Sequence, residues 1–369
     1  MSGRVDLRAL GDDPALAIIQ QDVAEIVGQL GPKLELLSGA TIVVTGASGM
    51  LGAYVADVLS VLNPSGALRS ACTVYLATRQ VPSTGSRLGH LVGRSDVHFV
   101  VGDALARGAL PVKADVFVHA ASPASPRHYL ADPVATLDAN SRYLRALLDL
   151  ARLNDARSFV YVSSCEIYGD PPEHSIPTAE TYVGTVDPLS PRSCYAEGKR
   201  FGEALCMAFY RQYGLPINVV RPFHVHGPGL RLDDGRIVAE LIRVGLQGAQ
   251  FTLSSDGTAT RCYGYVSDAT VGLLSTLLDD QHGETYNIGA DSPETSMLEL
   301  AAVVADLMGT PPPLTSSGPL PAHLVGAPRR SRPDLSKART LLAYTPRVTL
   351  RDGLSRTIAW QRLTAQTRR

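Results

Sequence analysis

Short runs of β-branched residues alternate with helical patterns of apolar residues from Thr41 onward. Strands are expected at 41–45, 73–78, 97–101, 115–120, 159–164 and 217–223, and helices at 50–62, 133–153 and about 193–213. Strands joined by crossover helices form a parallel sheet that is covered on both faces. The pattern therefore predicts an α/β fold with a Rossmann-type, doubly wound parallel sheet.

The two ends of the chain depart from this central pattern. Residues 1–38 carry apolar residues at helical spacing and predict one amphipathic helix, an N-terminal extension that packs onto the main domain. Beyond Pro228 the pattern shortens, and Pro and Gly cluster at 310–333, as expected of loops that build a substrate site. We expect a Rossmann domain at 39–225, with returning segments at about 260–290, and a smaller mixed α/β substrate-binding domain mainly at 226–369.

Composition narrows the class of function. A chain of 369 residues exceeds one typical core, so a large domain with a smaller second unit is expected. The formal net charge of −1 gives no attraction for polyanions, so nucleic acid is not an expected partner. The chain shows no secretory leader and no apolar run of about 18 residues, which predicts a cytoplasmic protein without a membrane partner. Five cysteines without CxxC spacing predict reduced thiols and no metal site.

A glycine-rich segment lies between the first expected strand and the first expected helix. Gly46, Gly49 and Gly52 have a GxxGxxG spacing, which allows a tight turn and the close approach of a pyrophosphate to the helix N-terminus. We therefore predict a bound NAD, contacted by Gly46, Ser48, Gly49, Met50, Leu51 and Gly52. Asp103, after the third expected strand, is expected to accept a hydrogen bond from the adenine amino group; an ordinary turn aspartate is the alternative.

The second expected strand leaves the choice between NAD and NADP open. It should end beside the adenosine ribose, where an NAD-preferring fold usually presents an acid. Residues 58–95 contain no acid, and the strand ends in Thr78 and Arg79, with Arg87 following. An arginine here either pairs with a 2′-phosphate, which favours NADP, or is a solvated surface residue.

Three residues predict redox chemistry. Ser164 ends the fifth expected strand, and Tyr195 and Lys199 follow on a helix, where a spacing of four residues puts phenol and ammonium on one face. A nearby lysine cation stabilises a phenolate and is expected to lower the pKa of the tyrosine, while the serine hydroxyl holds the same substrate oxygen. Together with the glycine-rich loop upstream, this order predicts the oxidation of an alcohol.

Longer motifs carry a resemblance to a known family. The chain resembles the extended short-chain dehydrogenases that act on nucleotide sugars, through HAASPASPRHY (119–129), SSCEIYGDP (163–171), PRSCYAEGKR (191–200), DDGRIV (233–238), TRCYGYVSD (260–268) and the closing RPDLSKARTLLAYTP. The resemblance covers nearly all of residues 40–365. It is closest to the UDP-glucuronate decarboxylases, also called UDP-xylose synthases, within the NAD-dependent epimerase/dehydratase family.

The resemblance implies roles for individual residues. Ser164, Tyr195 and Lys199 would form the oxidation triad, and Glu166 would act beside C5 of the sugar. Arg261 would contact the nucleotide diphosphate. A loop near the nicotinamide and the sugar would add the cofactor contacts Ala120, Ala121 and Ser122. The expected substrate contacts are Pro123, Ser125, Cys165, His224, Arg236, Arg261, Tyr263 and Arg330.

The favoured function is decarboxylation of a nucleotide hexuronate such as UDP-glucuronate. Oxidation at C4 makes a hexuronate a β-keto acid, which loses CO₂ readily, and return of the hydride gives a pentose. A 4-epimerase or 4,6-dehydratase, and a non-catalytic dinucleotide-sensing protein, are the alternatives. Two features depart from the family: His224 stands where the decarboxylases and many relatives have an asparagine, and the acid that NAD-using members carry after the second strand is missing. Cys165 stands where the dehydratases have an aspartate that acts as the acid for the 6-hydroxyl. A thiol is a poorer acid for removing a hydroxyl.

A homodimer is expected through the helices at about 133–153 and 193–213, which would form a four-helix interface. Leu144, Leu147, Leu148 and Leu150 supply more apolar surface than one sheet face needs.

Overall fold

The computed structural model describes residues 7–11, 13–102, 110, 112–316, 318 and 326–367. Its centre is a seven-stranded parallel sheet with the order β11-β6-β5-β4-β1-β2-β3. The strands are β1 (Thr41–Thr45), β2 (Thr73–Thr78), β3 (Val97–Val101), β4 (Val116–His119), β5 (Ser158–Val162), β6 (Ile217–Pro222) and β11 (Thr285–Ile288). This order is that of a Rossmann fold, so the predicted fold class is confirmed.

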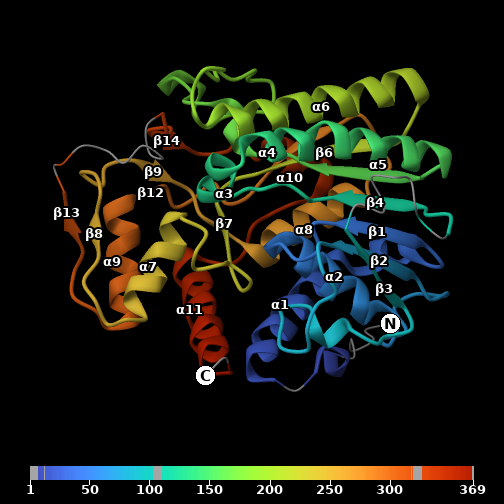
Figure 1. Ribbon diagram of the computed structural model, residues 1–369, viewed down its shortest axis with the longest axis horizontal. Helices are drawn as coiled ribbons and strands as arrows, with labels where there is room; N and C mark the ends of the chain where they lie inside the picture. Colours follow the sequence, from blue (N-terminus) through green and yellow to red (C-terminus); the bar gives the residue numbers. More distant parts are fainter. Residues whose placement is uncertain are drawn as a thin grey trace.

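Helices cover both faces of the sheet (Figure 1). One face carries α2 (Met50–Leu62) and α8 (Val266–Leu277), and the other carries α4 (Pro133–Asn140), α5 (Arg142–Leu153) and α6 (Ser193–Tyr213). Successive side chains of a strand point to opposite faces. Ile42 and Val44 of β1 therefore enter the core under α2 and α8, while Val43 enters the core under α5 and α6.

The N-terminal segment is divided, which corrects the expectation of one helix over 1–38. It consists of the 3-10 turn η1 (Leu7–Leu10), the helix α1 (Pro14–Leu30) and the 3-10 segment η2 (Gly31–Leu37). The helix ends because Gly31 has a φ of 51°, outside the helical region. As expected, α1 packs onto the main body, against α2, α8 and the C-terminal helix α11 (Leu350–Thr367). Its buried Asp22 accepts hydrogen bonds from Tyr54, Tyr265 and Arg356.

The helix expected over 133–153 is also divided. Ser141, with φ −120° and ψ −83°, separates α4 from α5. Leu144, Leu147, Leu148 and Leu150 are all buried in the core between α5, α6 and the sheet. These leucines therefore pack within a single chain. They do not supply the exposed apolar surface on which the dimer prediction rested.

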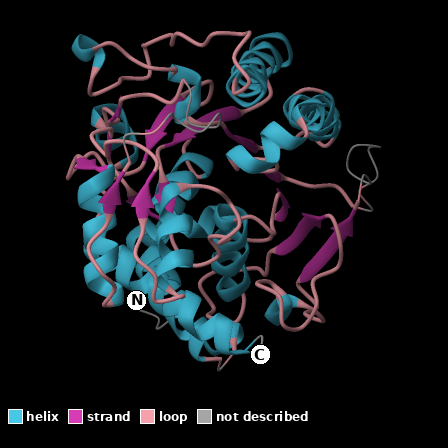
Figure 2. Cartoon of the chain, turned by 60° about the vertical axis from the view of Figure 1, so that its left-hand side comes forward, coloured by secondary structure: helices cyan, strands magenta, loops and turns pink. Residues whose placement is uncertain are grey.

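A smaller part of the molecule lies beside the sheet and has its own core. It contains α7 (Ile237–Gly245), α9 (Met297–Met308) and the parallel pair β8 (Thr252–Leu253) and β13 (Leu314–Thr315). Leu241, Ile242, Leu300 and Val304 are buried together there. Figure 2 shows this part standing apart from the main sheet. The domain boundaries expected from the sequence stay a prediction.

Short elements complete the described chain. They are α3 (Pro126–Ala131), β7 (Val225–His226) paired with β10 (Gly264–Tyr265), β9 (Thr260–Arg261) between β12 (Thr295–Ser296) and β14 (Arg330–Ser331), α10 (Ser336–Leu342), and the 3-10 turns η3 (Gly89–Leu91), η5 (Cys165–Tyr168) and η6 (Glu173–Ser175). Of these, α10 and η3 pack on the sheet side, α10 against α8 and β11 and η3 against α2. All five cysteines are buried and free. Among the described residues, no helix is long and apolar enough to cross a membrane.

Candidate active site

A pocket of about 2630 Å³ opens at the carboxyl ends of the sheet strands and continues into the smaller part. Single small-molecule sites usually measure roughly 300–1,000 Å³. The pocket is thus large enough for a dinucleotide and a second large ligand side by side. Open α/β sheets bind ligands at this edge, where the strand order reverses between β1 and β4.

The glycine-rich loop lines one end of the pocket. Gly46 has a φ of +69°, and a Cβ there would stand 2.6 Å from the Ala120 backbone. A Cβ on Gly52 would stand 2.3 Å from the Gly46 carbonyl oxygen, so this glycine lets α2 begin directly on the loop. The N-terminus of α2, capped by Gly49, faces the pocket with its unpaired N–H groups. The predicted contacts Ser48, Met50 and Leu51 line the same end. This cradle fits a dinucleotide pyrophosphate.

The adenosine end follows β2. Thr78 is buried and donates a hydrogen bond to the Gln80 carbonyl oxygen, while Arg79 is exposed at the pocket rim. Arg87 is neither a surface residue nor a free cation, since it forms an ion pair with the buried Asp57 of α2. The other predicted contact, Asp103, lies outside the described residues.

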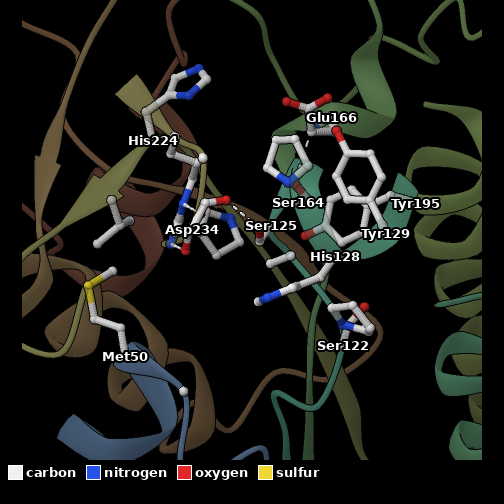
Figure 3. Close-up of a pocket in the computed structure, with 18 of the residues that line it drawn as sticks. Met50, Ser122, Ser125, His128, Tyr129, Ser164, Glu166, Tyr195, His224 and Asp234 are labelled. Carbon is white, nitrogen blue, oxygen red and sulfur yellow. Dashed lines mark hydrogen bonds and ion pairs between the residues drawn. The ribbon is translucent and has the colours of Figure 1, made fainter. Parts of the chain in front are cut away.

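The three predicted redox residues meet in the middle of the pocket. Ser164 lies two residues beyond β5, at the start of η5, and accepts a hydrogen bond from the Glu166 backbone N–H at 3.2 Å. Tyr195, on α6, stacks on Tyr129 with ring centroids 5.2 Å apart (Figure 3). Lys199, one turn further on, donates a hydrogen bond of 2.6 Å to the Val162 carbonyl oxygen, and its Nζ lies 5.9 Å from the Tyr195 ring centroid.

The sequence predicted a lowered pKa for Tyr195, and this prediction is wrong. Burial raises the pKa of Tyr195, and the hydrogen bond from Ser164 lowers it by less. Burial also lowers the pKa of Lys199 to about 7, so the ammonium is a weaker source of positive charge than the sequence suggested. The spacing of the three residues was therefore a better guide than the electrostatics assumed for them.

An ion pair beside the phenol involves a residue that sequence reasoning missed. Arg192, at the start of α6, donates a hydrogen bond of 2.8 Å to Glu166. The two side chains are only 13% and 25% exposed, so the pair is largely shielded from solvent. The Arg192 guanidinium also lies over the Tyr129 ring, at 5.8 Å from its centroid. Tyr129 and Arg192, which were both missed as site residues, fall inside the motifs 119–129 and 191–200. Those motifs were the only sequence signal for them.

The three arginines predicted to contact the substrate differ in their interaction partners. Arg236 is paired with Asp234 at 2.6 Å, and Arg330 is paired with Glu294 at 2.7 Å and also with Glu173. Arg261 is 6% exposed and donates only to backbone carbonyl oxygens, among them that of Thr260 at 2.7 Å. No carboxylate of the described residues lies within 4.0 Å of Arg261. A buried guanidinium without a counter-ion is a strong attractor for an anion.

His224 and Cys165 form a second polar group in the pocket. His224 has a φ of +35°, unusual for a side chain other than glycine, and its Nε2 lies 2.8 Å from the Ser331 hydroxyl oxygen. Burial lowers the pKa of His224 well below its usual value, and the Arg261 charge lowers it further, so the imidazole is neutral. Burial raises the pKa of Cys165 to about 12. Tyr263 lines the same wall and donates to the Met297 sulfur at 3.2 Å.

The loop after β4 closes the site from the sheet side. Ala120, Ala121 and Pro123 line the pocket, and Ser122 accepts a hydrogen bond of 3.0 Å from Asn140. Ser125 crosses the pocket to donate to the Asp234 backbone carbonyl oxygen (Figure 3). Within the described ranges, no cluster of His, Cys, Asp or Glu has the makings of a metal site.

A dinucleotide cradle leading to a serine, tyrosine and lysine defines a Rossmann-fold oxidoreductase centre of the short-chain dehydrogenase type. The model of the NAD dependent epimerase/dehydratase family matches residues 42–289. The chain belongs to this family and is an enzyme that uses NAD, of a class that modifies nucleotide sugars. The predicted family and cofactor are thereby confirmed.

Curated relatives extend over most of the chain. UDP-glucuronic acid decarboxylase 1 of Xenopus tropicalis is 33% identical over 323 residues, which cover 87% of this chain and 72% of that protein. UDP-glucuronic acid decarboxylase 6 of Arabidopsis thaliana is 35% identical over 317 residues, covering 86% of this chain and 87% of that protein.

Solved structures share the fold and belong to the same kind of enzyme. UDP-glucuronic acid 4-epimerase from Bacillus cereus, in complex with UDP-glucuronic acid and NAD, has a TM-score of 0.72 and 27% identity, covering 89% of this chain and 99% of that one. A dTDP-glucose 4,6-dehydratase from Streptomyces venezuelae with NAD bound has a TM-score of 0.73 and 25% identity, covering 87% and 97%.

Proposed function

We propose that this enzyme decarboxylates a nucleotide hexuronate, with UDP-glucuronate as the favoured substrate, and releases the nucleotide pentose and CO₂. The observation that carries the proposal is the Glu166–Arg192 ion pair beside Tyr195, which places an arginine for a carboxylate next to the oxidation centre. The names of the curated relatives support the same substrate.

The first step is oxidation at C4. Tyr195 accepts the proton of the C4 hydroxyl, and the Ser164 hydroxyl hydrogen-bonds the same oxygen. Lys199 holds its place by donating to the Val162 carbonyl oxygen, and its protonated form stabilises the Tyr195 phenolate that accepts this proton. NAD, when bound, supplies the acceptor that takes the hydride from C4 and later returns it, so the reaction is redox-neutral.

The second step breaks the C5–C6 bond of the 4-keto sugar. The bonding electrons move toward the C4 carbonyl as CO₂ leaves, which gives an enolate, and a proton is then added at C5. Arg192 is placed to pair with the C6 carboxylate before CO₂ leaves. The substrate carboxylate takes the position of Glu166, so the guanidinium remains paired. Glu166, displaced from Arg192, then stands beside C5 and relays to it a proton taken up from water.

The nucleotide diphosphate is assigned to Arg261. Its buried guanidinium has no carboxylate partner among the described residues, and a diphosphate provides one. Arg236 and Arg330 are already neutralised by acids, so we assign them to shaping the wall rather than to direct charge pairing. His224 and Tyr263 are assigned to the sugar side of the same wall.

A 4-epimerase acting on a hexuronate is the second candidate, because the Bacillus cereus epimerase shares the fold and was solved with UDP-glucuronic acid. That reaction also needs the arginine, but it keeps C6. Dehydration fits less well, because burial raises the pKa of Cys165 to about 12 and leaves no acid at the position that would protonate a leaving hydroxyl.

Incubation with UDP-glucuronate, UDP-glucose and the corresponding dTDP sugars tests the proposal, with products read by mass and retention time. Loss of the mass of CO₂ from UDP-glucuronate alone is the expected result. Unchanged mass with a new retention time would make the enzyme an epimerase, and loss of water would make it a dehydratase. No product from any of these sugars would contradict the assigned substrate class.

We further propose a homodimer through α4 and α6. The large apolar residues that these helices leave exposed include Val134, Leu137 and Phe201, whereas the leucines on which the dimer prediction rested are buried. A monomer by light scattering at micromolar concentration would reject this proposal. The cytoplasmic location expected from the sequence stays a prediction.

A further inference from the structure

The adenosine end of the pocket lacks the acid that an NAD-specific Rossmann fold places at the end of its second strand. Thr78 occupies that position, and its hydroxyl is directed to the Gln80 carbonyl oxygen. The described residues that line this end, from the glycine loop and from 77–88, include no aspartate or glutamate. A ribose 2′-hydroxyl therefore finds no carboxylate acceptor among the described residues there.

The carboxylate that Arg87 contacts is already paired. Asp57 on α2 is buried and is held by Arg87 and by His90, whose Nε2 lies 2.9 Å away. Although burial raises it, the Arg87 charge holds the pKa of Asp57 below its usual value, so the pair is ionised on both sides. Arg87 also lies over the Tyr54 ring, at 5.4 Å from its centroid. The cluster contributes structure and no net charge to the pocket.

Arg79 differs from Arg87 because it has no acidic partner among the described residues. It follows Thr78 directly, is exposed and lines the pocket. No carboxylate of the described residues lies within 4.0 Å of its guanidinium. Guanidinium groups bind phosphate oxygens through paired hydrogen bonds, and a ribose 2′-phosphate carries a negative charge that the described residues at this end do not supply.

We propose that Arg79 makes this pocket accept a ribose 2′-phosphate, so that NADP binds at least as tightly as NAD. The proposal concerns only the adenosine end of the dinucleotide. It holds whichever nucleotide sugar is the substrate, so its failure and that of the proposed function are separate events.

Two measurements on the full-length enzyme test the proposal. The cofactor that remains bound through purification is released by denaturation and identified by mass, and the stripped protein is titrated with NAD and with NADP by calorimetry. We expect NADP to bind with an equal or lower Kd than NAD, and its advantage to shrink at high salt, because the added contact is an exposed charge pair. A Kd for NADP above that for NAD would overturn the proposal.

Arg79→Ala locates the effect. We expect its Kd for NADP to rise about 10-fold, as for loss of a charge-assisted hydrogen bond, with little change for NAD. Arg69→Ala is the matched control: it removes an exposed arginine that precedes β2 in the chain, and it should change neither Kd. Thr78→Asp should weaken NADP further and spare NAD, since it restores the missing acid. If Arg79→Ala weakens both dinucleotides equally, Arg79 does not read the 2′-phosphate.

Discussion

The cofactor end and the sugar end of the pocket are formed by different chemical groups. The cofactor end consists of backbone, with Gly46 and Gly52 allowing close contacts and the N-terminus of α2 offering N–H groups. The sugar end consists of charged side chains brought from separate segments, among them Glu166, Arg192 and Arg261. Most of these charges are paired with each other in advance. A backbone cradle depends on local sequence and geometry, whereas a charged wall depends on which partner each side chain finds.

The largest effect is expected at Tyr195, where the cofactor end and the sugar end of the pocket meet. Tyr195→Phe keeps the ring that stacks on Tyr129 but removes the group that accepts the C4 proton. Turnover of UDP-glucuronate should fall by at least about 10². Thermal unfolding should be nearly unchanged. Tyr213→Phe, at the exposed end of the same helix, is the control and should turn over like the wild type. Normal turnover by Tyr195→Phe would refute the redox mechanism.

Arg192→Gln tests the charged wall. Truncating one partner of a largely buried charge pair costs about 2–5 kcal/mol, so kcat/KM for UDP-glucuronate should fall at least about 30-fold. Binding of UDP alone should change little, because the diphosphate is assigned to Arg261. Arg211→Gln, exposed on the same helix, provides the matched control. Equal losses for UDP and UDP-glucuronate would show that Arg192 does not recognise the sugar carboxylate.

Gly46→Ala tests the backbone cradle. The new Cβ would stand 2.6 Å from the Ala120 backbone, so the loop must shift and dinucleotide binding should weaken by about 10-fold or more. Gly66→Ala is a close control, since Gly66 also has a positive φ, +63°, but has nothing within 4 Å of the added atom. Calorimetric titration of both variants separates backbone strain from the clash. Cofactor affinity lowered equally in both would contradict the role given to Gly46.

The smallest effect concerns buried histidines and pH. Burial lowers the pKa of His119 to about 3 and that of His226 to about 4. Below about pH 6.5 the unfolded chain binds protons at these sites and the folded chain does not, so stability is full above that pH and falls as the pH drops. Replacing His226 with Gln should reduce the loss between pH 7 and 5 by about 2 kcal/mol in urea unfolding. His98→Gln, at an exposed site, should leave the loss unchanged.

Much of the fold could be predicted because its signals are local. The strand β1 and the helix α2 were expected at the residues where they occur, since one is a β-branched run and the other an apolar helix after a glycine turn. The breaks at Gly31 and Ser141 were missed, because apolar periodicity continues across both positions. Periodicity reports which side chains face a core and does not report where the backbone turns.

The site was predictable to a different degree at its two ends. The glycine loop and the Ser164, Tyr195 and Lys199 set follow from spacing, and the structure brings them to one pocket. The pairing of Arg192 with Glu166 joins residues 26 positions apart through the tertiary fold, which no local pattern encodes. The burial that controls the pKa of Tyr195 is likewise a property of the assembled structure.

The most direct test of the central claim uses UDP-glucuronate carrying deuterium at C4 of the sugar. If C4 is oxidised and later reduced within one active site, and C6 leaves in between, the product is a nucleotide pentose that has lost CO₂ and kept the deuterium at C4. Mass spectrometry and proton NMR of the purified product read both features together. A pentose without the deuterium would contradict the redox-neutral cycle, and recovery of a hexuronate with inverted C4 would contradict decarboxylation.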